Sequence, residues 1–191
     1  MADVFTVLAQ DHVEVQAMLA ELEKGQTRAT GASENHLALR KKMTEALIIE
    51  ESKHEALEEM YFWPAVREYH SAGDTLADEA TGQEQEAKHV LAELDKLDAS
   101  DTRFEELLGE FIAAAREHIA FEETQVWPAL RSVLPAQVAS ELGTKIAEGK
   151  KTAPTRPHPH TPASPAVLKA AGPAVAAADK VRDAATGRGT D

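Results

Sequence analysis

Apolar residues recur with helical spacing along the first 150 residues and divide this region into four long blocks. The predicted helices cover about residues 3–24, 33–64, 74–97 and 101–128. Their apolar stripes contain, in order, Leu8, Val15, Leu19 and Leu22; Met43, Leu47, Leu57 and Tyr61; Leu76, Ala80, Ala87, Val90, Leu94 and Leu97; and Leu107, Phe111, Ala114 and Phe121. Because no segment alternates apolar and polar residues as a strand would, the pattern predicts an all-α fold.

Short connections separate the predicted helices. Ser33 and Asp101 are suitable N-caps for the second and fourth helices, and Pro64 and Pro128 are expected to end or kink them. Short connections favour antiparallel neighbours, so we expect an up-down antiparallel four-helix bundle. A short extra helix over about residues 135–148 is expected to pack on the end of this bundle.

The composition changes at Lys151. The stretch TAPTRPHPHTPASP holds five prolines in fourteen residues, which predicts an extended or disordered linker. The following AVAAADKVRDAAT could form a short Ala-rich helix. We therefore expect a domain over residues 1–150 and a flexible Pro/His/Ala-rich tail over residues 151–191, and this tail is a candidate contact for a protein partner.

Composition and charge exclude several classes of function. The chain has no cysteine, so any metal must be held by histidine and carboxylate groups. The formal net charge is −13 overall, and residues 1–150 are more acidic still, so nucleic-acid binding is not expected. The N-terminal residues do not resemble a signal peptide, and no apolar stretch is long enough for a membrane span. A cytoplasmic protein without membrane contact is therefore expected.

Two segments repeat at an offset of 64 residues: HEALEEMYFWP at 54–64 and HIAFEETQVWP at 118–128. In each, a glutamate follows the histidine by four residues, so both side chains project from one face of a helix. The other two predicted helices each carry a histidine on or beside the apolar stripe. The candidate metal ligands are therefore His12, His54, Glu58, His89, His118 and Glu122.

The alternative is a metal-free bundle in which these are core histidines and helical i, i+4 pairs. Buried ionised carboxylates are costly unless they are paired or bind a metal, which favours the metal site. Imidazole and carboxylate ligands without sulfur suit iron, manganese or zinc, and bundle interiors hold di-iron carboxylate sites. Two glutamates bridging two metals would leave positions for an oxo bridge and for a diatomic or peroxide ligand.

The order of these motifs resembles the hemerythrin-like (HHE cation-binding) domain family, of the four-histidine, two-glutamate type, over about residues 3–150. The resemblance implies two non-haem iron ions with an oxo or hydroxo bridge. It implies that the histidines are terminal ligands and that the glutamates bridge. Oxygen carriers of the family have a histidine where this chain has Glu93 and an aspartate where it has Glu123. The chain is therefore more similar to bacterial members associated with peroxide, nitric oxide or iron-centre repair.

The leading hypothesis is a di-iron protein that binds or reacts with peroxide or dioxygen, with catalase-like peroxide disproportionation as its most concrete form. The alternative is a module that senses iron, oxygen or nitric oxide, or stores iron, without turnover. A ferritin-like oxidase is a third reading, because E-x-x-H occurs at Glu51-His54 and Glu86-His89, but that architecture needs glutamates where this chain has His12 and His118.

Residues near the candidate ligands in the sequence suggest further roles at the site. Glu50 could accept a hydrogen bond from an imidazole, or it could be a surface carboxylate. Tyr61 could hydrogen-bond a bound oxygen species, with plain packing as the alternative, and it is the one candidate catalytic residue. Trp63 and Trp127 are expected to pack at the bundle end.

Overall fold

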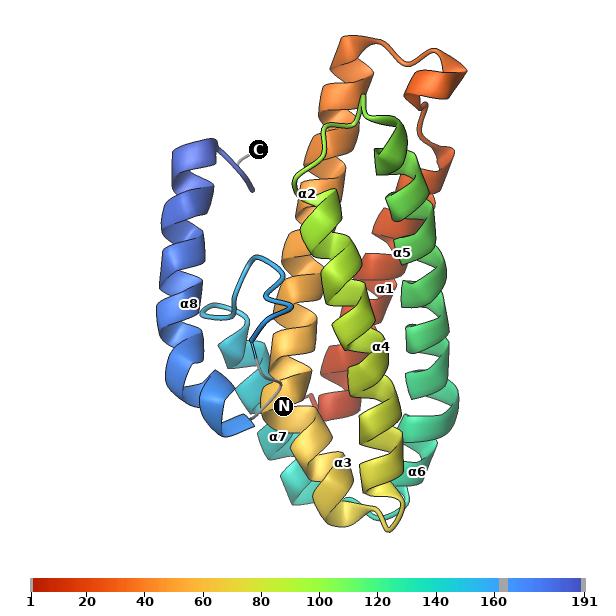
Figure 1. The fold of residues 1–191 in the computed structure, drawn as a ribbon. Helices are drawn as coiled ribbons and strands as arrows, with labels where there is room; N and C mark the ends of the chain where they lie inside the picture. The colour runs from red at the N-terminus through yellow and green to blue at the C-terminus, as the bar shows by residue number, and fades with distance from the viewer. Residues whose placement is uncertain (1, 162–164, 190–191) are drawn as a thin grey trace.

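The computed structural model describes residues 2–161 and 165–189, and these residues form helices and loops with no strand (Figure 1). The elements in chain order are α1 (Val4–Lys24), the short 3-10 turn η1 (Arg28–Thr30), α2 (Glu34–Leu57), the π-helical segment η2 (Glu58–Phe62), α3 (Trp63–Tyr69), α4 (Gly73–Leu94), α5 (Thr102–Phe121), the π-helical segment η3 (Glu122–Val126), α6 (Trp127–Arg131), α7 (Ala136–Gly149) and α8 (Pro165–Thr186). The predicted all-α class is confirmed. None of the described helices has the length and apolar character needed to cross a membrane.

The long helices α1, α2, α4 and α5 run side by side, and each runs opposite to the one before it (Figure 1). The predicted caps form, because the side chain of Ser33 accepts from the N–H of His36 and that of Asp101 accepts from the N–H of Arg103. The turn into α4 brings Gly73 so close to α3 that a Cβ there would lie 2.1 Å from the carbonyl oxygen of Val66. Glycine is therefore required at this turn.

The repeated sequence motif produces a repeated structural motif. Each π-helical segment begins at the glutamate of an H-x-x-x-E pair, Glu58 in η2 and Glu122 in η3. The chain stays helical beyond Pro64 and Pro128, which lie in the first turns of α3 and α6, because the first turn does not need the N–H that proline lacks. Single π turns inside helices are frequent at functional sites.

Two apolar clusters fill the interior, and a layer of buried polar side chains lies between them. One cluster includes Leu8 and Ala56, and the other includes Val15 and Ile48. The buried polar residues of α1 and of the second half of α2 fall between these positions: Asp11, His12, Glu51, Ser52, His54 and Glu55. Burying this many ionisable groups is unfavourable without partners, so the layer marks a candidate site.

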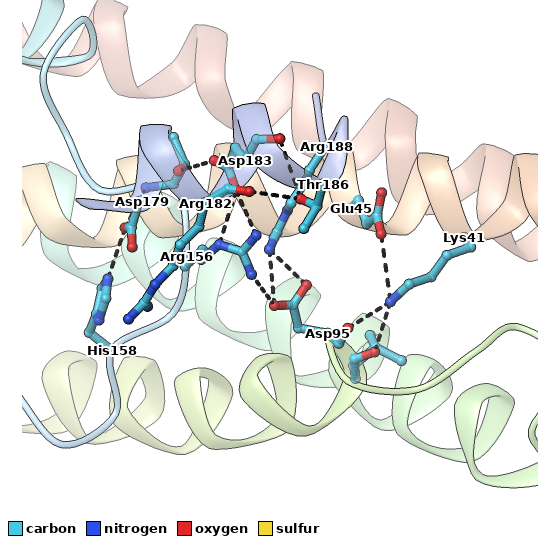
Figure 2. Close-up of polar contacts among 12 residues, drawn as sticks. Lys41, Glu45, Asp95, Arg156, His158, Asp179, Arg182, Asp183, Thr186 and Arg188 are labelled. Carbon is cyan, nitrogen blue, oxygen red and sulfur yellow. Dashed lines mark hydrogen bonds and ion pairs between the residues drawn. The ribbon is translucent and has the colours of Figure 1, made fainter. Parts of the chain in front are cut away.

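The segment predicted to be a flexible tail lies against the bundle over the residues that the structure describes. Residues 152–161 and α8 pack on the bundle, and α8 contacts η2 (Figure 1). The reason is a network of ion pairs around Asp95, which we call the Asp95 network (Figure 2). Arg156 lies 3.2 Å from Asp95 and 2.8 Å from Asp183 of α8, and Arg188 lies 2.8 Å from Asp95.

Candidate metal centre

The polar layer contains two groups of metal-ligand side chains. One consists of His12, His54 and Glu122, and the other of Glu58, Glu84 and His118; within each group the ligand atoms all lie within 4.8 Å of one another. All of these residues are buried except His118, which is partly buried. They come from α1, α2, η2, α4, α5 and η3, so all four long helices position the cluster.

Glu122 joins two helices at this cluster. One of its carboxylate oxygens lies 3.0 Å from Nε2 of His12, and the other lies 3.9 Å from Nε2 of His118. On the opposite side, Nε2 of His54 lies 3.2 Å from a carboxylate oxygen of Glu58. All three imidazoles therefore direct Nε2 toward buried carboxylates.

Each of the three imidazoles also contacts a side chain of its own through Nδ1. Nδ1 of His12 lies 3.0 Å from Glu123, that of His54 lies 3.4 Å from Asp11, and that of His118 lies 3.0 Å from Gln83. Such contacts fix the ring orientation and leave Nε2 for a metal. Lys150, from the end of α7, also contacts Asp11 and anchors that carboxylate.

The carboxyl groups of the cluster differ in proton affinity. Burial, together with the nearby charge of Glu122, raises the pKa of Glu58 well above its usual range. Burial also raises the pKa of Glu84. In Glu122, burial acts in the same direction, but the nearby His118 and the contact with His12 outweigh it and lower the pKa. Without a metal, Glu58 therefore has a higher proton affinity than Glu122.

The residues present fit a bound metal. Several of their buried atoms make no well-directed hydrogen bond, even where a charged neighbour lies close: both carboxylate oxygens of Glu58 and of Glu122, Oε2 of Glu84, and Nε2 of His12 and His118. Such atoms are costly to bury unless something satisfies them. Imidazole nitrogen and carboxylate oxygen are ligands that iron, manganese and zinc accept.

The structure does not bring His89, the ligand predicted for the third helix, into this cluster. His89 is exposed on α4, its Nε2 lies 3.2 Å from Nε2 of Gln85, and its ring centroid lies 5.8 Å from that of His160. Glu84 lies five positions earlier, about 140° away around the helix, and it takes the interior position. The sequence prediction missed Glu84 because it placed the buried stripe of α4 one residue out of register. The stripe that is buried contains Ala77, Ala80, Glu84, Leu91 and Leu94.

Glu50 and Tyr61 lie outside the ligand cluster. Glu50 pairs with Lys53 at 2.7 Å and does not orient an imidazole. Asp11, and not Glu50, contacts Nδ1 of His54. Tyr61 is partly buried, and Lys169 of α8 lies 5.1 Å from its ring centroid.

Both tryptophans of the repeat contact the cluster. Trp127 stacks on His12 with ring centroids 4.9 Å apart and an interplanar angle of 13°. Nε1 of Trp63 donates to Glu84. The Trp-Pro repeat therefore supports the ligand side chains in addition to packing the end of the bundle.

Comparison with known proteins identifies the domain family and a similar fold. The hemerythrin HHE cation binding domain matches residues 3–130. The crystal structure of a hemerythrin HHE cation binding domain-containing protein from Mycobacterium kansasii superposes with a TM-score of 0.64 at 23% identity, covering 79% of this chain and 86% of that one. At this identity the likeness concerns the fold. Among curated proteins, no sequence gave a significant match.

Proposed function

Because the chain belongs to the hemerythrin HHE cation-binding domain family, we propose that its buried cluster binds two non-haem iron ions, and that the protein binds or reacts with peroxide or dioxygen there. The observation that carries this proposal is the convergence of unpartnered buried nitrogen and oxygen atoms from four helices on one polar layer.

The ligand set differs from the expected four histidines and two glutamates. His12, His54 and Glu122 would hold one iron, and Glu58, Glu84 and His118 the other. Glu58 and Glu122 have both carboxylate oxygens unpartnered, which suits bridging. Three carboxylates then offset much of the charge of two cations, so burying the pair of metals becomes less costly.

Bound iron would supply one-electron and two-electron redox chemistry and open positions for a small oxygen ligand. The chain's own residues would prepare that site. Asp11, Glu123 and Gln83 hold the imidazoles through Nδ1, and the apolar clusters on either side of the polar layer exclude bulk water. Peroxide disproportionation, in which one peroxide is reduced to water while another is oxidised to dioxygen, is the most concrete reaction for such a site.

The second candidate function is sensing or storage without turnover. The contact of α8 with η2 supports it, because η2 begins with the candidate ligand Glu58. A change at the metal centre would then reach the tail through one helical segment. In this alternative the tail is the part that would contact a protein partner.

The proposal is tested by metal analysis after anaerobic loading with ferrous iron. The parent protein should bind about two irons per chain, and a Glu58→Ala, Glu122→Ala double variant should lose most of them. Glu50→Ala is the control, because Glu50 lies in α2, the helix that leads into η2, and is outside the cluster. Near-zero iron in a folded parent would overturn the proposal, and parallel loading with manganese and zinc would identify a different metal.

Oxygen evolution from peroxide then separates the two functions. Sustained evolution that disappears in the double variant supports turnover. Stoichiometric reaction without sustained evolution supports sensing or storage.

A further inference from the structure

A second pocket lies outside the metal centre, between the bundle and the C-terminal tail. Its enclosed volume is about 40 Å³, and its mouth opens toward solvent. α2, η2 and α4 form its floor, and residues 154–161 together with α8 form its roof. Ligand pockets commonly lie between packed helices.

The two sides of this pocket differ in chemistry. The roof is mostly apolar and includes Pro154, Pro157, Leu168, Ala171 and Val175. The floor is polar and presents Ser52, Glu55, Glu59 and Lys88, each of them buried. An apolar wall that faces a few buried polar groups suits a small amphipathic molecule.

Two of the floor groups lack partners. Oγ of Ser52 and Oε2 of Glu55 are buried without a hydrogen bond, although Ser52 is only 5% exposed and Glu55 only 3%. The ammonium group of Lys88 lies 2.6 Å from Glu59, and its charge also acts on Glu55, but it makes no hydrogen bond with Oε2 of Glu55. Leaving buried polar groups unsatisfied costs free energy, so these two atoms are suited to a ligand.

The charged side chains that line the pocket indicate which kind of ligand it can bind. Besides Lys88, the pocket is lined by Arg156, and its guanidinium is already paired with Asp95 and Asp183. His158, also in the lining, lies 2.9 Å from Asp179. The basic groups that line the pocket are thus already paired with carboxylates, whereas Oε2 of Glu55 and Oγ of Ser52 have no hydrogen bond. An ammonium group would satisfy both, whereas a carboxylate would meet Glu55 and Glu59 without a free cation.

We propose that this pocket binds a small organic cation, a primary amine with a short aliphatic body, whose ammonium group donates to Glu55 and Ser52 and whose carbons pack beneath α8. None of the candidate metal ligands lines this pocket, although its floor adjoins them, and the pocket exists only because the tail is docked.

The Asp95 network keeps the roof in place (Figure 2). Arg156 lines the pocket and joins α8 to the end of α4, and Arg188 makes a second connection to Asp95. Thr155 adds contacts to Asp179 and Asp183. These contacts hold the apolar roof residues over the floor and confine the ligand to a small size.

The test is a calorimetric titration of the full chain with n-butylammonium chloride, compared with butan-1-ol, sodium butyrate and ammonium chloride at matched ionic strength. The butylammonium ion should bind and the other three should bind much more weakly. Glu55→Gln keeps the side-chain shape but removes the charge, and it should weaken binding roughly ten- to hundredfold. Glu50→Gln, on the same helix outside the pocket, is the matched control.

A second pair of variants tests the place of binding without touching a charged group. Ala171→Phe would fill the space beneath α8 and should abolish binding, whereas Ala170→Phe, on the exposed side of α8, should preserve it. The proposal is overturned if butanol or butyrate binds as tightly as the amine, if the amine does not bind at millimolar concentration, or if Glu55→Gln or Ala171→Phe leaves binding unchanged. Metal content, measured in the same samples, shows separately whether the metal centre is intact.

Discussion

Nε1 of Trp63 donates a hydrogen bond of 2.5 Å to Oε1 of Glu84, and both side chains are buried. This contact joins the first residue of α3 to the middle of α4. The other carboxylate oxygen of Glu84 has no hydrogen-bond partner, and Glu84 groups with Glu58 and His118. The tryptophan therefore orients the one candidate ligand that α4 contributes.

The first prediction contrasts the two candidate ligands of α4. Glu84→Ala should lose at least one iron per chain, because it removes a buried ligand group. His89→Ala should keep the iron content of the parent, because His89 is exposed outside the cluster. Elemental analysis after anaerobic ferrous loading measures both. The opposite result, with loss only in His89→Ala, would show that His89 is the ligand from α4.

The second prediction concerns the tryptophans. Trp63→Phe keeps an aromatic ring but removes the donor to Glu84, so iron affinity should fall about 10- to 100-fold, the usual effect of losing a group that orients a ligand. Trp127→Phe is the matched control, because the buried Nε1 of Trp127 has no hydrogen-bond partner. Competition with a chelator measures the affinities. Equal effects in the two variants would assign both rings to packing alone.

The third prediction is a pH dependence of stability in the metal-free protein. Burial raises the pKa of Glu58 in the folded state above its ordinary value of 4.5, so between these two values the folded state binds more protons than the unfolded state. The stability from this group is complete below about pH 4.5 and is lost as the pH rises through the folded-state pKa. From about pH 4.5 up to the folded-state pKa, the free energy of unfolding should therefore fall more steeply in the parent than in Glu58→Gln.

Urea unfolding of chelator-treated protein at several pH values provides the measurement. The difference in slope should reach at most about 1.4 kcal/mol per pH unit, the value for one proton. Metal loading should remove the difference, because the metal replaces the proton. Identical slopes in the metal-free parent and Glu58→Gln would contradict this account of the buried carboxyl.

The fourth prediction concerns the docking of the tail. Asp95→Asn removes the negative charge shared by Arg156 and Arg188, and it should weaken docking by about 1–3 kcal/mol, because the side chain of Arg188 is buried. Limited proteolysis between residues 151 and 161 should become faster in this variant. Glu93→Gln is the control, since its ion pair with Arg103 is exposed and contributes little. An unchanged rate for Asp95→Asn would show that apolar contacts alone hold α8.

The sequence by itself determined the helices, their caps and the repeated H-x-x-x-E segments, because these depend on local spacing along the chain. Ser33 and Asp101 cap helices as the pattern predicts, and His54, Glu58, His118 and Glu122 reach the polar layer together with His12. Four-residue spacing puts each histidine and glutamate on one helical face wherever that helix packs.

Tertiary structure decided the features that depend on contacts between distant residues. On α4, Leu76 and Val90 fit one stripe and Ala77 and Glu84 fit a neighbouring one, and only packing against the other helices selects the stripe that is buried. The partners of the imidazole Nδ1 atoms come from other helices. Asp95 holds the tail through arginines 61 and 93 residues away along the chain. Such long-range ion pairs leave no periodic signal in the sequence, because their geometry exists only once the helices have assembled.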